Sequence, residues 1–295
     1  MSCSKFIFEG LFQSKEQAKL HLDNNLAVFC DATFYVVPSI SYQILITREY
    51  AKIFHRFFTT SFTIMLNKEE KTYEKIFTEL KINIQNYANN ILYKPKEFHS
   101  DFELGMSNAF KKVFPTSNIK FCLWHMGRAL ENHFHNYCKI DEIDFNINYV
   151  IKLFKFIESK NNNDNFSNFL KYFENNYLRK YNIKSWNYND NIENTTNNCC
   201  ESYNNKLKNY FYKKPTYYKF LFVLRREEDD IIKENIRLTT GIWTSKRKII
   251  FGRSDEKDLI VRYFEDKIND LKENNSSDDT IIEEWFNCLK RLSGR

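Results

Sequence analysis

The chain has 295 residues, and its 44 Lys plus Arg against 38 Asp plus Glu give a formal net charge of +6 when His is neutral. Because 42% of the residues are hydrophobic and 17% aromatic, wholesale disorder is excluded and one sizeable core is expected. The sequence has no run of the roughly 18 to 20 apolar residues that a membrane span needs, and its start shows no signal peptide. Seven irregularly spaced Cys favour a reducing compartment, cytosolic or nuclear.

The modest net charge hides an asymmetry along the chain. Residues 205–253 contain 13 basic and 5 acidic residues, whereas residues 255–284 contain 4 basic and 11 acidic residues. A basic stretch before an acidic one is typical of a face that binds a polyanion, followed by a solvated tail. Exposed helix faces of mixed charge are the alternative explanation.

The first half of the chain begins with three strand signals. The apolar run Leu26–Cys30 ends at Asp31, as expected of a strand buried on both faces. Alternating apolar residues over 42–46 predict a second strand, and 58–66 predict a third. Apolar residues at helical spacing then predict an amphipathic helix over about 69–91.

Strands and helices alternate after that helix. A short strand over Glu97–Ser100 leads to a helix over 102–113 that stops before Pro115, and a strand over 119–123 leads to a helix that begins near His125. Hairpin connections favour antiparallel pairing of the first three strands, and helical crossovers favour parallel pairing of the later ones. We therefore expect a mixed five-stranded α/β sheet with flanking helices, in the element order of a ribonuclease H-like fold.

The remaining regions complete the predicted domain organisation. Residues 1–25 form a lead-in, and residues 26–140 form the first part of the core. Helical spacing without strand signals predicts an all-helical insertion over 141–190. A core helix over 191–215 follows, and 216–295 is expected to be mostly helical with an acidic tail.

Asp31 and Asp101 each follow a predicted strand. In open α/β sheets, ligand sites gather at the carboxyl ends of strands. If the two strands are neighbours and the carboxylates lie about 4 Å apart, their repulsion is roughly 4 kcal/mol at an effective dielectric of about 20. Such a pair requires a cation or a retained proton, and Mg²⁺ or Mn²⁺ suits oxygen ligands and phosphate substrates. A turn or helix-cap role for each Asp is the alternative.

A third acid, Glu201, lies in a predicted helix. On one polar face of that helix it is joined by Asn197, Asn204, Asn205 and Lys208. An acid flanked by amides and a cation can face a metal and a phosphate together. If Asn198 is the helix cap, however, Glu201 occupies the third helical position and could serve as a capping-box glutamate.

These segments resemble, in order and spacing, the conserved blocks of Mutator-like (MULE) transposases over about 26–214. The matching residues are Asp31-Ala-Thr-Phe with Pro38 and Gln43; the helix start Leu66–Tyr73 with Phe77 and Leu80; Asp101-Phe-Glu with Ala109 and Phe114-Pro115; Phe121-Cys-Leu-Trp-His125; and Thr196-Asn197 with Glu201-Ser202 and Asn204. Each motif is short, and the match gains its specificity from their combination.

The resemblance implies a DDE-type DNA transposase with a ribonuclease H-like core. Asp31, Asp101 and Glu201 would be the catalytic triad that binds two Mg²⁺ or Mn²⁺ ions for strand nicking and strand transfer. The implied partners are double-stranded DNA, as transposon ends and target, and further copies of the chain, in the nucleus of a eukaryote or otherwise in the cytoplasm.

Two other functions remain open. Relatives usually carry a separate DNA-binding module before the core, whereas residues 1–25 show no zinc-finger spacing. A domesticated or decayed DNA-binding or regulatory protein without catalysis is therefore the alternative. A ribonuclease H-like nuclease that acts on RNA–DNA hybrids fits the fold but not the long helical insertion.

Cys122 and His125 form a Cys-x-x-His element. With His133, His135 and Cys138 they could bind Zn²⁺, which favours thiolate and imidazole ligands. The three His fall on differing faces of one predicted helix, however. We therefore favour a buried Cys and a hydrogen-bonded His near the active site over a structural zinc site.

Basic residues after the third acid are candidate phosphate contacts: Lys206, Lys208, Lys213, Lys214, Arg225, Arg226, Lys246, Arg247 and Lys248. Aromatic residues interleave with them, namely Tyr210, Tyr212, Tyr217 and Trp243. A cluster of this composition is typical of a surface that contacts phosphates and stacks on exposed bases.

Overall fold

A computed structural model describes residues 10–24, 26–87, 92–138, 164–186, 197–211 and 214–241, together with scattered residues between 263 and 284. The chain divides into two compact units, one formed by Met1–His125 and Lys184–Trp243 and the other by Met126–Ile183 and Thr244–Arg295. We describe each unit by itself. The first unit contains the whole sheet and all three predicted acids.

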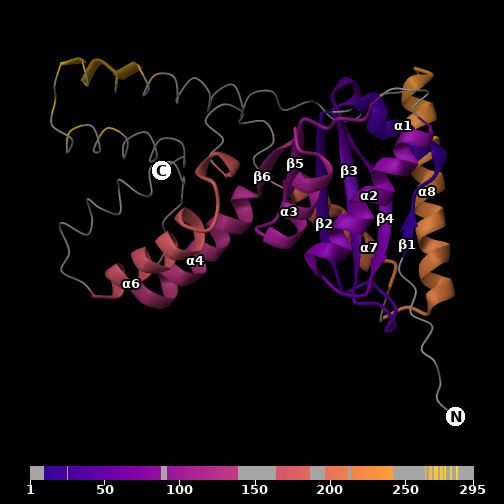
Figure 1. The fold of residues 1–295 in the computed structure, drawn as a ribbon, viewed down its shortest axis with the longest axis horizontal. Coiled ribbons are helices and arrows are strands. Elements are labelled where there is room, and N and C mark those ends of the chain that lie inside the picture. The colour runs from indigo at the N-terminus through magenta and orange to yellow at the C-terminus, as the bar shows by residue number, and fades with distance from the viewer. Residues whose placement is uncertain are drawn as a thin grey trace, which may run out of the picture. The chain divides into compact units, whose positions relative to one another are not determined.

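The first unit is built on a six-stranded mixed sheet (Figure 1). In chain order its strands are β1 (Gly10–Phe12), β2 (Ala27–Thr33), β3 (Gln43–Ala51), β4 (Arg56–Met65), β5 (Glu97–Ser100) and β6 (Asn118–Phe121). The order across the sheet is β1-β4-β3-β2-β5-β6, with antiparallel pairs from β1 to β2 and parallel pairs from β2 to β6.

The mixed α/β class and the expected change from antiparallel to parallel pairing are confirmed. The expected number of strands is wrong by one, because β1 adds an edge strand beside β4. With only three residues, β1 is too short to show the alternation on which strand prediction depends. Leu123 also lies in the helix after β6 rather than in the strand itself.

Helices cover both faces of the sheet (Figure 1). One face carries α1 (Lys15–Asn24), α2 (Glu70–Asn86) and α3 (Leu104–Val113), and the other carries α7 (Asn198–Lys208) and α8 (Tyr217–Thr239). A short 3₁₀ turn, η1 (Lys52–Phe54), links β3 to β4. The sheet is therefore the middle of three layers.

Strand residues alternate between these two layers because successive side chains point to opposite faces. In β3, Leu45 packs in the cluster with α2, whereas Ile44 and Ile46 pack in the cluster with α7 and α8. In β2, Cys30 packs toward α2 and Phe29 lies in a cluster with residues of α7. This explains the continuous apolar run before Asp31, since both faces of the strand are buried.

Three aromatic rings join α2, β5 and α3. The ring of Phe98 stacks on that of Phe110 with centroids 3.9 Å apart, and both meet the ring of Phe77 edge to face. All three side chains are fully buried. Each such pair contributes roughly 0.5–1.5 kcal/mol beyond its burial, so this cluster fixes β5, and the acid that follows it, against the helical layer.

The second unit is described only in part. Helix α4 (Leu123–Cys138) starts in the first unit and continues into the second, which also contains α6 (Asp164–Phe173) and a π-helical turn, η3 (Glu174–Leu178). A 3₁₀ turn, η4 (Ile183–Ser185), lies at the boundary. Most of the expected insertion over 141–190 lies outside the described residues. Among the described helices, none is long and apolar enough to cross a membrane.

Candidate active site at the strand ends

Asp31 and Asp101 lie at the ends of neighbouring strands. The parallel register of β2 and β5 pairs Ala27 with Glu97 and Phe29 with His99. Continuing this register by two residues places Asp101, which directly follows β5, opposite Asp31. The condition on which the paired-carboxylate hypothesis rests, adjacency of the two strands, is therefore met.

Helix α7 brings Glu201 to the same edge. The Nδ2 of Asn204 donates to Oδ2 of Asp31 at 2.6 Å, and the Nδ2 of the fully buried Asn197 donates to the carbonyl oxygen of Cys30 at 2.9 Å. Both contacts join α7 to the end of β2. Residues separated by more than 160 positions in the sequence are thereby placed side by side, with Glu201 between the two anchoring amides.

His125 connects two of the acids. Its Nδ1 lies 2.8 Å from Oδ1 of Asp101 and 3.4 Å from Oε1 of Glu201. The side chains of these three residues are between 24% and 33% exposed, so the cluster is open to solvent and to a ligand. His125 stands in the first turn of α4, three residues after Cys122, which lies between β6 and α4.

The capping-box alternative for Glu201 does not fit this geometry. Helix α7 starts at Asn198 with Asn197 as its cap, and the side chain of Asn197 accepts no capping hydrogen bond from the helix backbone. Glu201 is thus the fourth helical residue, whereas a capping box needs an acid at the third. The backbone N–H of Asn197 donates instead to Sγ of Cys122 at 3.1 Å.

The acids perturb one another electrostatically. Removal from water, followed by repulsion from Asp101 and Glu201, raises the pKa of Asp31 to about 7, against the lowering effects of the Ala32 N–H and His125. For His125, burial lowers the pKa, but the contacts with Asp101 and Cys122 outweigh it and raise the pKa to about 10. At neutral pH the site therefore holds one imidazolium among three acids, and negative charge is in excess.

This excess, together with oxygen donors on adjacent strand ends, fits a divalent cation. Among the described residues, however, the group whose ligand atoms all lie within 4.8 Å of one another is Asp101, Cys122 and His125, and not the three acids. The imidazole of His125 lies against both Asp101 and Glu201. Acids that flank two ions about 3.5–4 Å apart need not touch one another.

Cys122 and His125, expected near the active site, do lie beside Asp101. Cys122 is buried, and its sulfur accepts the Asn197 N–H, which helps to position α7. The side chains of His133, His135 and Cys138 lie outside the described set. The donor set described combines one thiol and one imidazole with a single carboxylate, and the structural zinc site, which was the less favoured alternative, stays untested.

The predicted basic residues separate into two groups. Lys206 pairs at 2.7 Å with the buried carboxylate of Glu227, which also accepts hydrogen bonds from the hydroxyls of Tyr203 and Tyr210. Burial raises the pKa of Glu227, but these three donors outweigh it and hold the pKa below its ordinary value. Lys206 and Tyr210 thus join α7 to α8.

The other predicted basic residues are, like Lys206, exposed where they are described. These are Lys208, Lys214, Arg225 and Arg226. Lys213, Lys246, Arg247 and Lys248 lie outside the described residues, as do Tyr212 and Trp243, and Tyr217 is half-buried at the start of α8.

Sequence reasoning missed Arg48, which supports the third acid. This residue of β3 donates from Nη1 to the carbonyl oxygen of Cys199 at 2.5 Å and from Nη2 to that of Phe57 at 2.9 Å. Its guanidinium also lies 4.9 Å from the ring centroid of Tyr203. A single Arg in a strand carries no sequence signal for such a role, because its partners are known only once α7 is placed.

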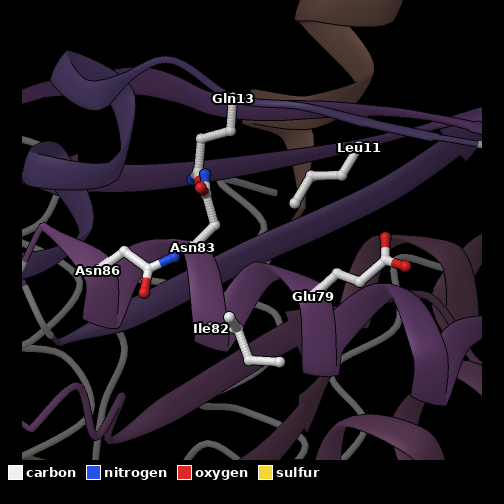
Figure 2. Close-up of a pocket in the computed structure, with 6 residues that line it drawn as sticks. All are labelled: Leu11, Gln13, Glu79, Ile82, Asn83 and Asn86. Carbon is white, nitrogen blue, oxygen red and sulfur yellow. The ribbon is translucent and has the colours of Figure 1, made fainter.

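A separate pocket of about 310 Å³ lies between β1 and α2 (Figure 2). It is lined by Leu11, Gln13, Glu79, Ile82, Asn83 and Asn86. Nδ2 of Asn83 donates to Oε1 of Gln13 at 2.7 Å, and the amide of Gln13 in turn donates to the carbonyl oxygen of Thr60. These amides link the edge strand to the helical layer, and none of the predicted site residues lines the pocket.

A comparison with curated proteins returned no match. Residues 28–128, however, match the family model of the MULE transposase domain. The matched segment runs from β2 to the first turns of α4 and includes Asp31, Asp101, Cys122 and His125, whereas Glu201 lies beyond it. The part of the chain that carries these four residues is therefore similar to the MULE transposase domain.

Proposed function

We propose that this protein is a DDE-type DNA transposase with a ribonuclease H-like catalytic core. The observation that carries the proposal is the register that sets Asp31 opposite Asp101, with Glu201 brought to the same edge by α7. The match of residues 28–128 to the MULE transposase domain supports a transposase-related function, and the convergence of three acids supports the catalytic form of that function.

Asp31, Asp101 and Glu201 would hold two Mg²⁺ or Mn²⁺ ions. Such ions would activate the attacking oxygen and stabilise the leaving oxygen in an in-line displacement at phosphorus. The proposed reaction is hydrolysis that nicks DNA at the transposon end, followed by attack of the freed 3′-hydroxyl on target DNA.

The chain's own residues would orient the acids. The amide of Asn204 donates to Oδ2 of Asp31, and the backbone N–H of Ala32 donates to Oδ1 at 2.8 Å. The imidazolium of His125 lies against the carboxyl groups of Asp101 and Glu201 and would reduce the repulsion between them. The geometry is thereby preorganised before DNA arrives, which lowers the cost of reaching the reactive arrangement.

Double-stranded DNA is the proposed partner. The exposed cations Lys208 and Lys214, on or just after α7, and Arg225 and Arg226 on α8 would contact its phosphates. Such contacts position a duplex without reading its sequence, so binding should weaken with salt. Pairing of two DNA ends by two copies of the chain, in the nucleus of a eukaryotic cell, belongs to the same proposal.

The test is cleavage of duplex DNA in the presence of Mg²⁺ or Mn²⁺. Asp31→Asn, Asp101→Asn and Glu201→Gln should each abolish nicking while duplex binding persists. The matched control is Asp229→Asn, which neutralises an exposed acid on α8 and should nick as the wild type does.

Three outcomes decide among the functions considered. Metal-dependent nicking that each of the three substitutions removes would support the transposase. Duplex binding without any cleavage would favour a regulatory protein derived from a transposase. Cleavage of RNA–DNA hybrids but not of duplex DNA would favour a nuclease of the same fold.

A further inference from the structure

The segment that follows β2 exposes two aromatic rings beside the acids. Phe34 is 53% exposed and Tyr35 is 62% exposed, although neighbouring Val36 and Val37 are fully buried in the cluster with α7 and α8. The two exposed rings contact each other, with centroids 4.6 Å apart and planes tilted by 34°. Buried neighbours hold this segment in place, so the ring pair is presented to solvent from a fixed base.

A cation adjoins the ring pair. Nζ of Lys208 lies 4.6 Å from the ring centroid of Tyr35. Lys208 belongs to α7 and follows Glu201 by seven residues, which is about two helical turns, or about 10 Å along the axis. The aromatic pair, the cation and the third acid are therefore joined through one helix.

The distance from the acids is short. Phe34 follows Asp31 by three residues, so the Cα atoms of the two residues lie at most about 10–11 Å apart even when the chain is fully extended. Successive nucleotides of a strand rise about 3.4 Å in duplex DNA. A base on the ring pair would thus belong to a nucleotide within a few positions of the phosphate at the acids.

We infer that Phe34 and Tyr35, with Lys208, form a stacking platform for an unpaired nucleobase of the DNA strand that enters the acidic site. This inference rests on the proposed function. Exposed aromatic rings next to a cation form the combination that binds single-stranded nucleic acid, in which rings stack on bases and cations contact phosphates. A protein partner would not need the cation on the ring, and a base inside a duplex is stacked on both faces, so it has no free face to offer.

The test measures binding in EDTA, so that it does not depend on cleavage. The probes are a fluorescein-labelled oligothymidylate, a blunt duplex of the same length, and an oligothymidylate with one 2-aminopurine. Phe34→Ala and Tyr35→Ala should each weaken single-strand binding on the order of 5- to 100-fold and reduce 2-aminopurine quenching. Blunt-duplex binding should change by less than about twofold, since all but the terminal base pairs are stacked on both faces.

Two controls separate stacking from a general effect. Tyr218→Ala removes an aromatic ring that is 85% exposed on α8 and should leave single-strand binding unchanged. Phe34→Tyr retains a ring of similar shape and should retain the binding and quenching that Phe34→Ala loses. Because Phe34 and Tyr35 are exposed, their variants should unfold at the wild-type temperature.

Wild-type single-strand affinity in Phe34→Ala and Tyr35→Ala, or an equal loss for the blunt duplex, would overturn the inference. A change in self-association alone, seen by light scattering, would assign the surface to a second copy and also overturn it. The platform and the catalytic proposal can fail separately. If the wild type quenches 2-aminopurine but does not nick DNA, only the catalytic proposal is contradicted. If the wild type nicks DNA but Phe34→Ala and Tyr35→Ala do not change single-strand binding, only the platform is contradicted.

Discussion

Asp31→Asn is expected to remove part of the pH dependence of the unfolding free energy in the metal-free protein. The substitution replaces an ionisable group whose pKa in the folded state is about 7, against an ordinary value of 3.8. An acid with a raised folded pKa binds its proton more tightly when folded. The stability it contributes is complete below about pH 4 and is lost as the pH rises through 7.

The magnitude follows from the two pKa values. Between them, stability falls by about 1.4 kcal/mol per pH unit, which amounts to about 3 kcal/mol between pH 5 and pH 8. Asn at this position carries no charge and lacks this loss. The two carboxylate oxygens of Asp31 accept hydrogen bonds from Ala32 and Asn204, whereas Asn has only one acceptor oxygen in its side chain. The lost hydrogen bond costs about 1–2 kcal/mol at every pH, which opposes the stability gained at high pH.

Urea unfolding in EDTA at pH 5, 6, 7 and 8 measures this effect. The difference in unfolding free energy between Asp31→Asn and the wild type should move in favour of the variant by up to about 3 kcal/mol as the pH rises. Asp229→Asn, on the exposed face of α8, should show a constant difference. A constant difference for Asp31→Asn as well would refute the argument that burial and neighbouring acids destabilise its charged form.

Three further substitutions probe the supports of the site. His125→Gln should destabilise the metal-free fold by roughly 1–2 kcal/mol at pH 7 but not above pH 10. Because the pKa of His125 is raised from 6.5 to about 10 on folding, the stability that its protonated form contributes is complete below about pH 6.5 and is lost as the pH rises through about 10. Urea unfolding at the two pH values measures the loss. Glu227→Ala should cost about 2–4 kcal/mol, since the buried hydroxyl of Tyr203 and the half-buried hydroxyl of Tyr210 lose their acceptor and the exposed Lys206 loses its ion-pair partner. The exposed Asp230→Ala should cost less than about 0.5 kcal/mol; thermal melting compares them. Asn197→Ala should cost about 1–3 kcal/mol and slow nicking by about tenfold or more while duplex binding persists, because α7 loses its bond to β2; unchanged nicking would show that this bond does not position Glu201.

The sheet was accessible from the sequence because its signals are local. The run over 26–30 and the alternation in β3 both follow from burial on two faces, which any hydrophobic pattern records. The edge strand β1 was missed for the opposite reason. It has three half-buried residues and obtains its place from pairing with β4, which lies 50 residues away in the sequence.

Of the candidate site, only the acids could be predicted from the sequence. Asp31 and Asp101 could be singled out because each follows a strand, and their adjacency could be inferred from helical crossovers. The contacts of Arg48 with Cys199 and of Asn197 with Cys30 were not accessible, since each joins residues more than 150 positions apart. Such contacts depend on where α7 comes to lie, and no local pattern encodes that.

The proposed catalysis and the proposed platform depend on this same placement of α7. Asn204 holds Asp31, Arg48 holds the carbonyl of Cys199, and Lys208 lies on the ring of Tyr35, so the helix carries contacts to the sheet along its length. The anchors to β2 and β3 lie within one turn of Glu201, whereas Lys208 lies about two turns beyond it. A shift of α7 along its axis would therefore move Glu201 together with Lys208, the cation of the platform, while a change at Phe34 or Tyr35 alone would leave the acids in place.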